Sequence, residues 1–240
     1  MGNGIYKAVS ATRAQLRRLD VLANNIANAS TPGFKEDAVR FEEVMDQRAQ
    51  GVQDFVQSVE SVTRMTQGTL RATGNPLDVA ISGEGFFVVE TPDGEKLTRA
   101  GHLVIGAERV LHTDSGHKIM GEAGPIVVPP APPGVTAPLS IDGQGEIKLG
   151  DLVVGTLRRV TVPDNNVRKL GNNLFSTEVE PRRLDSATGG QVMQGHIELS
   201  NVNPLGAMTK MIQVQRTFDS LQQAIKAYRE VDQQSVRRMR

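Results

Sequence analysis

The chain has 240 residues; its 27 basic and 27 acidic side chains balance, aromatic residues make up only 4%, and cysteine and tryptophan are absent. Balanced charge leaves no net field for nucleic acid or an anionic membrane surface, and a chain without cysteine has no disulfide, thiolate ligand or thiol nucleophile. No apolar stretch approaches the roughly 20 residues that cross a bilayer, and the N-terminus lacks the basic start and apolar run of a secretory signal. We therefore expect no nucleic-acid partner and no direct membrane insertion, and any export should follow a route without a cleaved signal.

The first segment with a clear period runs from about Ile5 to Asn28 and is predicted to be a helix. Its apolar positions step alternately by four and three residues: Ile5, Val9, Thr12, Leu16, Leu19, Ala23 and Ile26. This heptad spacing is typical of a helix that packs lengthwise against another helix. The helix should end before Pro32, which cannot continue it, and Gly33 suits a backbone with positive φ.

The middle of the chain is predicted to be rich in β-structure. Residues 35–67 fit no single period, and residues 41–45 (FEEVM) could form a helical turn. From about Gly68 to Gly195, apolar residues alternate with polar ones between turn signals, which indicates short strands. Candidate strands are residues 77–81, 86–91, 96–99, 103–105, 110–113, 126–128, 139–141 and 152–162. Their spacing predicts an antiparallel sandwich or barrel-like sheet and not alternating β and α units.

The last segment is a second predicted helix, with Asn203 as its N-cap and Pro204 at the first helical position. Its apolar residues again step by four and three: Ala207, Met211, Val214, Phe218, Leu221, Ile225 and Tyr228, with Met208 and Ile212 widening the stripe. Each helix alone could belong to one globular core. Two such stripes at the two ends of the chain favour pairing with each other or with other chains, with the middle as a separate lobe.

These elements predict an α+β fold, in which paired N- and C-terminal amphipathic helices form an assembly core beside a central antiparallel β-rich domain. The expected divisions are residues 1–34 for the first helix and its turn, 35–75 for a connector, 76–195 for the β-rich domain and 196–240 for the C-terminal helix.

The residues offer little chemistry. The four histidines, His102, His112, His117 and His196, form no metal-binding pattern, although His112 and His117 could converge across a hairpin. The acids Asp142, Glu146 and Asp151 are close in sequence but typical of solvated loops. The glycine-rich stretch 82–85 (SGEG) has no strand-loop-helix setting and no phosphate-binding lysine, so it is interpreted as a tight turn before the next strand. We expect no catalytic residue, no cofactor and no metal.

Three segments together resemble the signatures of bacterial flagellar rod and hook proteins. They are residues 22–35 (LANNIANASTPGFK), residues 73–87 (TGNPLDVAISGEGFF) followed by 98–101 (TRAG), and residues 195–204 (GHIELSNVNP). The short length and residues 116–129 (GHKIMGEAGPIVVP) look most like the proximal-rod members of the family, with the longer distal-rod paralogue as the runner-up. Residues 105–110 (IGAERV) depart from the Asp-x-x-Gly hairpin turn of the family.

The resemblance implies a structural subunit of the flagellar basal-body rod, exported through the flagellar type III apparatus and assembled in the periplasm. Its partners would be copies of itself, other proximal and distal rod subunits and the export apparatus, in a shaft that transmits motor torque to the hook. A distal-rod or hook-type paralogue, or a β-domain hydrolase or carbohydrate-binding protein, is the alternative. The candidate subunit-interface residues are Ile5, Val9, Leu16, Leu19, Ala23, Ile26, Asn24, Asn25, Asn28, Pro32, Phe34, Asn201, Asn203, Met208, Met211, Val214, Phe218, Leu221, Ile225 and Tyr228.

Overall fold

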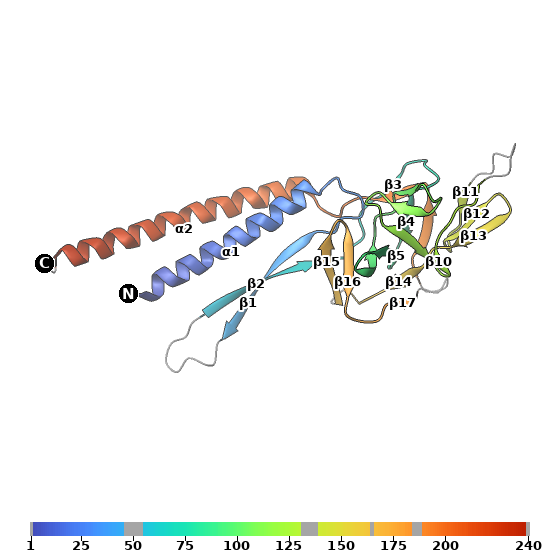
Figure 1. Cartoon of the computed structure of the whole chain (residues 1–240). Helices are drawn as coiled ribbons and strands as arrows, with labels where there is room; N and C mark the ends of the chain where they lie inside the picture. The colour runs from blue at the N-terminus through green and yellow to red at the C-terminus, as the bar shows by residue number, and fades with distance from the viewer. Residues whose placement is uncertain (1, 46–54, 131–138, 164–165, 184–188, 239–240) are drawn as a thin grey trace. The chain divides into compact units, whose positions relative to one another are not determined.

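The computed structural model describes residues 2–45, 55–130, 139–163, 166–183 and 189–238. Over these residues the fold is α+β, with one helix at each end of the chain and an antiparallel β-rich region between them (Figure 1). The chain forms two compact units. The helical unit comprises Met1–Ala29, Asp37–Val62 and Val202–Arg240, and the β unit comprises Ser30–Glu36 and Thr63–Asn201. The two units are interleaved along the sequence.

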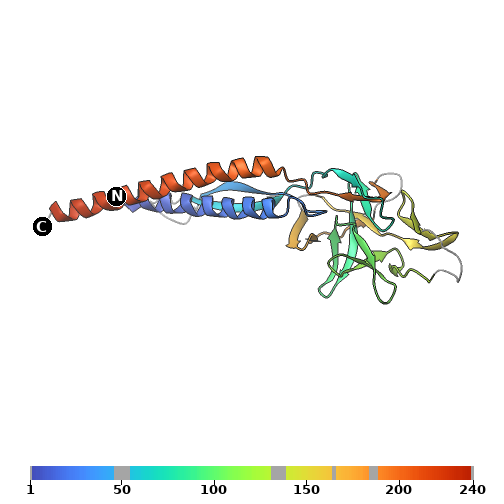
Figure 2. The same cartoon turned by 90° about the horizontal axis from the view of Figure 1, so that it is seen from above.

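The helical unit contains α1 (Gly2–Ala27), α2 (Pro204–Arg238) and a pair of strands, β1 (Asp37–Met45) and β2 (Phe55–Thr63). The two helices lie side by side with the chain termini at the same end, so they run antiparallel (Figures 1 and 2). The suggestion of a helical turn at residues 41–45 is wrong, because β-branched and aromatic side chains favour an extended strand there and β1 pairs with β2. No helix in the described ranges is long and apolar enough to cross a membrane.

The helix boundaries follow the predicted signals. The Asn203 side-chain Oδ1 accepts a hydrogen bond from Gly206 N at 3.0 Å, which is the N-cap expected before Pro204. At the end of α1, Asn28 N donates to Asn24 O at 3.1 Å and Ala29 N donates to Ile26 O at 3.2 Å, after which the helix stops. Both predicted ends are therefore confirmed.

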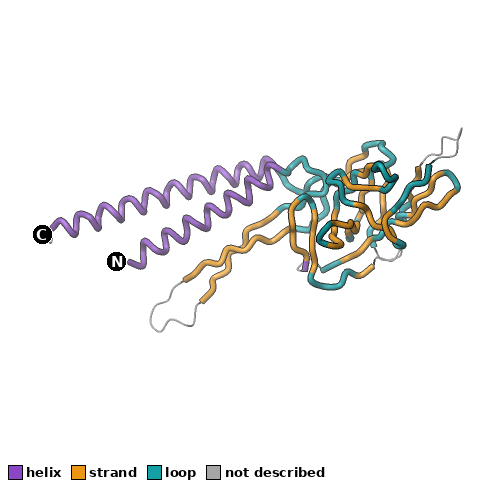
Figure 3. The backbone as a smooth tube through the Cα atoms, in the orientation of Figure 1, coloured by secondary structure: helices purple, strands orange, loops and turns teal. Residues whose placement is uncertain are grey.

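The β unit is built from short strands (Figure 3). They are β3 (Leu70–Ala72), β4 (Val79–Ser82), β5 (Phe86–Thr91), β6 (Gly94–Thr98), β7 (Leu103–Ile105), β8 (Leu111–Thr113), β9 (Lys118–Gly121), β10 (Gly124–Pro125), β11 (Leu139–Ile141), β12 (Glu146–Leu149), β13 (Leu152–Thr156), β14 (Arg159–Thr161), β15 (Val167–Gly171), β16 (Leu174–Thr177), β17 (Arg182–Arg183), β18 (Gln191–Gln194) and β19 (His196–Glu198). The candidate strand at 152–162 is thus two strands, and the one at 126–128 holds only an isolated bridge between Val110 and Val127.

The largest sheet follows the order β15-β16-β6-β5-β9-β8-β7, with β10 on β9, β14 on β5 and β17 on β14. Three smaller sheets are β11-β12-β13, β4-β18 and β3-β19. Every pairing with a recorded register in this unit is antiparallel, as the sequence predicts.

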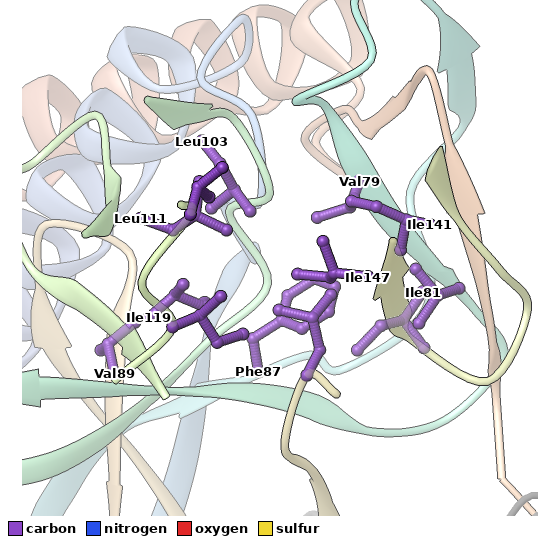
Figure 4. Close-up of a cluster of buried hydrophobic side chains, with 13 residues drawn as sticks. Val79, Ile81, Phe87, Val89, Leu103, Leu111, Ile119, Ile141 and Ile147 are labelled. Atoms are coloured by element: carbon purple, nitrogen blue, oxygen red, sulfur yellow. The ribbon is translucent and has the colours of Figure 1, made fainter. Parts of the chain in front are cut away.

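Strand β5 separates two hydrophobic clusters, because successive side chains of a strand point to opposite faces. Phe87 and Val89 belong to the larger cluster (Figure 4), and Phe86 and Val88 belong to the smaller one. The larger cluster contains Val79, Ile81, Phe87, Val89, Leu103, Leu111, Ile119, Ile126, Val128, Ile141, Ile147, Leu157 and Val192. The smaller contains Phe86, Val88, Leu97, Val160, Val162, Val167 and Phe175. The continuous apolar run of β5 is therefore buried on both faces.

The hairpin turn between β7 and β8 has Arg109, and not a glycine, at its left-handed position. Arg109 adopts a left-handed φ of 59° there. Its Nε donates to Val128 O at 2.7 Å, and its guanidinium also donates to Pro129 O at 2.9 Å. These hydrogen bonds hold a non-glycine residue in a backbone conformation that it would otherwise disfavour.

Candidate functional site: the motif junction and the helix pair

The three segments that carry the family resemblance meet inside the β unit at one buried charge cluster, the junction cluster of Lys35, Arg99 and Glu198. Lys35 Nζ lies 2.6 Å from Glu198 Oε1, and Arg99 donates to Glu198 Oε2 at 3.1 Å. All three side chains are buried. Burial makes this arrangement costly unless the charges are paired and fully hydrogen-bonded.

Backbone groups complete the cluster. Glu198 Oε1 also accepts from Gly68 N at 2.9 Å, Lys35 Nζ donates to Thr66 O at 2.9 Å, and Arg99 donates to Gly83 O at 2.9 Å. One carboxylate therefore joins segments that lie 99 and 163 positions away in the sequence. The arrangement connects segments that are remote in sequence, and we interpret it as a contact that stabilises the fold of the β unit.

Backbone contacts also hold the segment Ser30–Glu36 in the β unit. Gly33 has a φ of 72°, as predicted, and its N–H donates to Glu198 O at 2.8 Å. A Cβ at this position would lie 2.6 Å from Ala100 N, so only glycine fits. Phe34 is buried beneath the Lys169 ammonium, which lies 3.5 Å from the ring centroid, a cation–π contact.

One proline and two asparagines that were predicted for the subunit interface make contacts within their own unit. Pro32 O accepts from Asn173 at 2.9 Å. Asn201 accepts from Glu36 N at 2.6 Å and donates to Arg64 O at 2.9 Å. In the helical unit, the buried Asn25 donates to Asp37 O at 2.7 Å and accepts from Asp37 N at 3.0 Å. Periodicity could not reveal these roles, because they depend on contacts with distant backbone groups.

The predicted stripe of α2 is the face that this helix turns inward. Ala207 and Val214 are buried, and the other members of the inward row are half-buried: Met211, Phe218, Leu221 and Ile225. Met208, Ile212 and Tyr228 are exposed, as is Leu205, which the sequence analysis did not single out. The four-three spacing therefore located the inward face of α2 correctly up to Ile225.

On α1 the inward face differs from the predicted stripe. The buried residues are Ala14, Leu22 and Asn25, whereas Val9 and Leu16 are 37% and 44% exposed and Ala23 is exposed too. The remaining predicted positions are mixed: Thr12, Leu19, Ile26 and Asn28 are half-buried, Asn24 is exposed, and Ile5 lies in α1 outside the residues whose side chains are described. The inward face thus follows the row of Ala14, Leu22 and Asn25, which the predicted four-three stripe does not include. The interface role of the predicted stripe stays a prediction.

The histidines considered as candidates for a metal site form hydrogen bonds with neighbouring groups of the chain. His102 Nδ1 lies 2.6 Å from an oxygen of the buried Asp78, whose carboxylate also receives Thr73 Oγ1 at 2.6 Å. His112 Nδ1 lies 2.8 Å from Val110 O. Within the described ranges, no group of three or more His, Asp or Glu side chains is placed to hold a metal ion.

The acidic loop and the glycine-rich stretch are turns. Asp142 Oδ1 accepts hydrogen bonds from the backbone N–H groups of Gln144 and Glu146, both at 2.9 Å. Beside this turn, the hydrogen bond from Lys148 to Glu146 raises the pKa of the lysine. Burial lowers the pKa of the Arg159 guanidinium, which lies in β14. Gly83 and Gly85 have φ of 106° and 125°, which is the predicted tight turn before β5.

Comparison with known proteins agrees with the three segments. Residues 5–35 match the family described as flagella basal body rod protein, residues 80–149 match the flagellar hook protein FlgE/F/G D1 domain, and residues 193–238 match the flagellar basal body rod FlgEFG protein C-terminal family.

Several similar relatives are named flagellar basal-body rod protein FlgF, and others, such as one from Bacillus subtilis that is 28% identical over 98% of each chain, are named flagellar basal-body rod protein FlgG. The relative from Mesorhizobium japonicum is 33% identical over 92% of this chain and 90% of its own length. That from Caulobacter vibrioides is 33% identical over 100% and 98%, and that from Salmonella typhimurium is 35% identical over 91% of each. With three family matches in order and relatives of this identity along nearly its whole length, the chain belongs to the flagellar basal-body rod protein family.

Proposed function

We propose that the chain is a structural subunit of the bacterial flagellar basal-body rod, placed in the proximal rod, and not an enzyme. The FlgF name of the three relatives and the resemblance of residues 116–129 to proximal-rod members support this position. In this role the subunit is exported through the flagellar type III apparatus without a cleaved signal. It assembles in the periplasm with copies of itself and with other rod subunits, and it transmits torque toward the hook.

The exposed apolar stripe of α1 is the observation that carries the proposal. Val9, Leu16 and Ala23 are seven residues apart, so they share one face of the helix, and that face is exposed in the single chain. Met208 and Ile212 extend a second exposed apolar patch on α2. Exposed apolar stripes of this kind mark surfaces that are covered by other chains. The α1 stripe therefore supports packing of α1 against neighbouring subunits.

The junction cluster fits the same role. A subunit that transmits torque needs a β unit that stays folded when force acts on it. Lys35, Arg99 and Glu198 connect three remote segments of the β unit through short charge-assisted hydrogen bonds, which are stronger than neutral ones.

The test compares two charge insertions in a strain that lacks the chromosomal copy. Leu16→Asp places a charge on the exposed apolar stripe, and Gln213→Asp places the same charge on an exposed polar position of α2. We expect Leu16→Asp to abolish swimming and to be absent from purified basal bodies, because a charge in a buried interface is strongly unfavourable. Gln213→Asp should assemble. Normal motility with Leu16→Asp would refute packing through this stripe.

The position along the rod is tested separately. Basal bodies from the deletion strain should lack a complete proximal rod by electron cryomicroscopy. A complete proximal rod in that strain would assign the chain to the distal-rod or hook-type alternative.

A further inference from the structure

The chain passes between the helical unit and the β unit at four places. These crossings lie between residues 29 and 30, 36 and 37, 62 and 63, and 201 and 202. α1 precedes the first crossing and α2 follows the last, so about 175 residues separate the two helices, and closing a long loop costs more entropy than closing a short one. Contacts that hold the crossings together would therefore favour pairing of α1 with α2.

One side-chain amide of the β unit, that of Asn201, connects three of the crossings. Its Oδ1 accepts a hydrogen bond from Glu36 N at 2.6 Å, and its Nδ2 donates to Arg64 O at 2.9 Å and to Thr66 O at 3.0 Å. Glu36 and Arg64 also contact each other, because Arg64 N donates to Glu36 O at 2.8 Å and the side chains form an ion pair at 3.5 Å. Glu36, Arg64 and Asn201, here called the crossing cluster, therefore join the second, third and fourth crossings on the β-unit side.

The first crossing is held near the same strand end. Gly33 N donates to Glu198 O at 2.8 Å, and Glu198 is the last residue of β19, just before Asn201. With the crossing cluster formed, the connection between the ends of α1 and α2 shortens from about 175 residues to about a dozen, which favours helix pairing by up to roughly 50-fold.

The helical unit has a matching contact on its own side of the second crossing. Asn25 of α1 accepts from Asp37 N at 3.0 Å and donates to Asp37 O at 2.7 Å. Asp37 directly follows Glu36, whose N–H is bound by Asn201. Two side-chain amides thus bind consecutive residues of the chain, one from α1 and one from the segment that leads into α2.

We propose that Asn201 is a positioning residue, through which the folded β unit brings together the segments that enter the helical unit and so promotes pairing of α1 with α2. Its amide restricts these segments while the helices are still apart, so less conformational entropy is lost when the helices pair. The inference goes beyond the proposed function, because it concerns the isolated chain and holds at any position along the rod.

Gln194 provides a matched control, because its amide has the same pattern of contacts elsewhere in the β unit. Its Oε1 accepts from Ile141 N at 3.1 Å, and its Nε2 donates to Leu139 O at 2.8 Å and to Pro76 O at 2.9 Å, all remote in sequence from the crossings. Amide hydrogen exchange is measured on the isolated full-length parent chain and on Asn201→Ala and Gln194→Ala. A third variant, Asn201→Asp, keeps the acceptor oxygen and loses the donor.

In Asn201→Ala we expect the amides of α1 and α2 to exchange about tenfold faster than in the parent, while those of Leu111 and Ile119 in the larger hydrophobic cluster keep their rate. Asn201→Asp should accelerate the same helix amides less. Gln194→Ala should accelerate Leu111 and Ile119 more than the helices. If Asn201→Ala does not fold, Asn201→Asp decides alone.

Unchanged helix exchange in the Asn201 variants would overturn the proposal. Equal acceleration of the helices and of Leu111 and Ile119 would also overturn it, because Asn201 would then only stabilise the β unit. The same holds if Gln194→Ala accelerates the helices as much as Asn201→Ala, or if the helices of the parent chain show no protection. None of these outcomes bears on the rod function, whose failure is read from the deletion strain and Leu16→Asp.

Discussion

Glu198 pairs with two buried cations, Lys35 and Arg99, and the free energy of unfolding of the β unit should depend on it. Glu198→Ala would leave Lys35 and Arg99 buried without their carboxylate, at 1% and 5% exposure. Removing one member of a buried ion pair costs about 3–5 kcal/mol. We expect the midpoint of urea unfolding of the β unit to fall accordingly.

The control for this substitution is an exposed ion pair. Glu178 lies 3.6 Å from Arg168, and both side chains are about four-fifths exposed. Glu178→Ala should change the unfolding free energy by less than about 0.5 kcal/mol, since such pairs contribute little. If Glu198→Ala were equally mild, the junction cluster would not stabilise the β unit.

A second prediction at the residue scale concerns Gly101, in the segment 98–101 that resembles the family. A Cβ at Gly101 would lie 1.6 Å from Val79 O, a backbone atom that cannot move aside cheaply. Gly101→Ala should therefore prevent folding or destabilise the chain by several kcal/mol. Gly143, where a Cβ would meet nothing within 4 Å, provides the control, and Gly143→Ala should be close to neutral. Circular dichroism during thermal unfolding measures both.

At the residue scale the sequence indicated which segments matter but not what their residues do. Lys35, Arg99 and Glu198 each lie in or beside a recognised motif, yet no local pattern predicts that they meet. Their contact depends on the route of the chain through the β unit, which periodicity does not encode. The positive φ of Gly33 was predictable, because a proline followed by a glycine is typical of a type II turn, and the structure confirms it.

At the scale of elements, the type and order of the main elements followed from sequence, but the inward face of α1 did not. The four-three spacing selects one row of each helix, and on α2 that row contains the buried Ala207 and Val214. On α1 the inward face contains Ala14 and Asn25, whose small size and side-chain hydrogen bonds permit close packing within the helical unit. The apolar spacing of the sequence cannot distinguish this row from the exposed row of Val9, Leu16 and Ala23.

Asn25 connects α1 to the start of β1, and its neighbour provides a matched test. Asn25 satisfies both the N–H and the C=O of Asp37, whereas Asn24 is exposed. Asn25→Ala would remove both of these hydrogen bonds, which should cost about 2 kcal/mol. Asn24→Ala should leave the stability within about 0.5 kcal/mol of the parent. Thermal unfolding gives the free energies, and faster amide exchange at Asp37 would identify the broken contact; equal effects of the two substitutions would argue against it.

At the scale of the whole molecule, the two units differ in how much apolar surface they bury by themselves. The β unit has two hydrophobic clusters. The helical unit has only a thin row of buried apolar residues among those described: Ala14, Leu22, Val202, Ala207 and Val214. Regions with few buried apolar contacts open locally at low free energy. The helical unit should therefore depend on neighbouring chains for its stability, and the β unit should not.

Hydrogen exchange on the isolated full-length chain tests this difference. Amides in the middle of α1 and α2 should exchange at least about 100-fold faster than those of Leu111 and Ile119, which lie in the larger cluster, because the helices open without global unfolding. In purified basal bodies the helices should become as slow as the β unit, since burial of the stripes by neighbouring subunits raises the free energy of opening. Leu111 and Ile119 serve as internal references, because their protection should be the same in both states. Helices that are already fully protected in the isolated chain would mean that the helical unit is stable alone, and that rod assembly adds contacts to a finished helix pair.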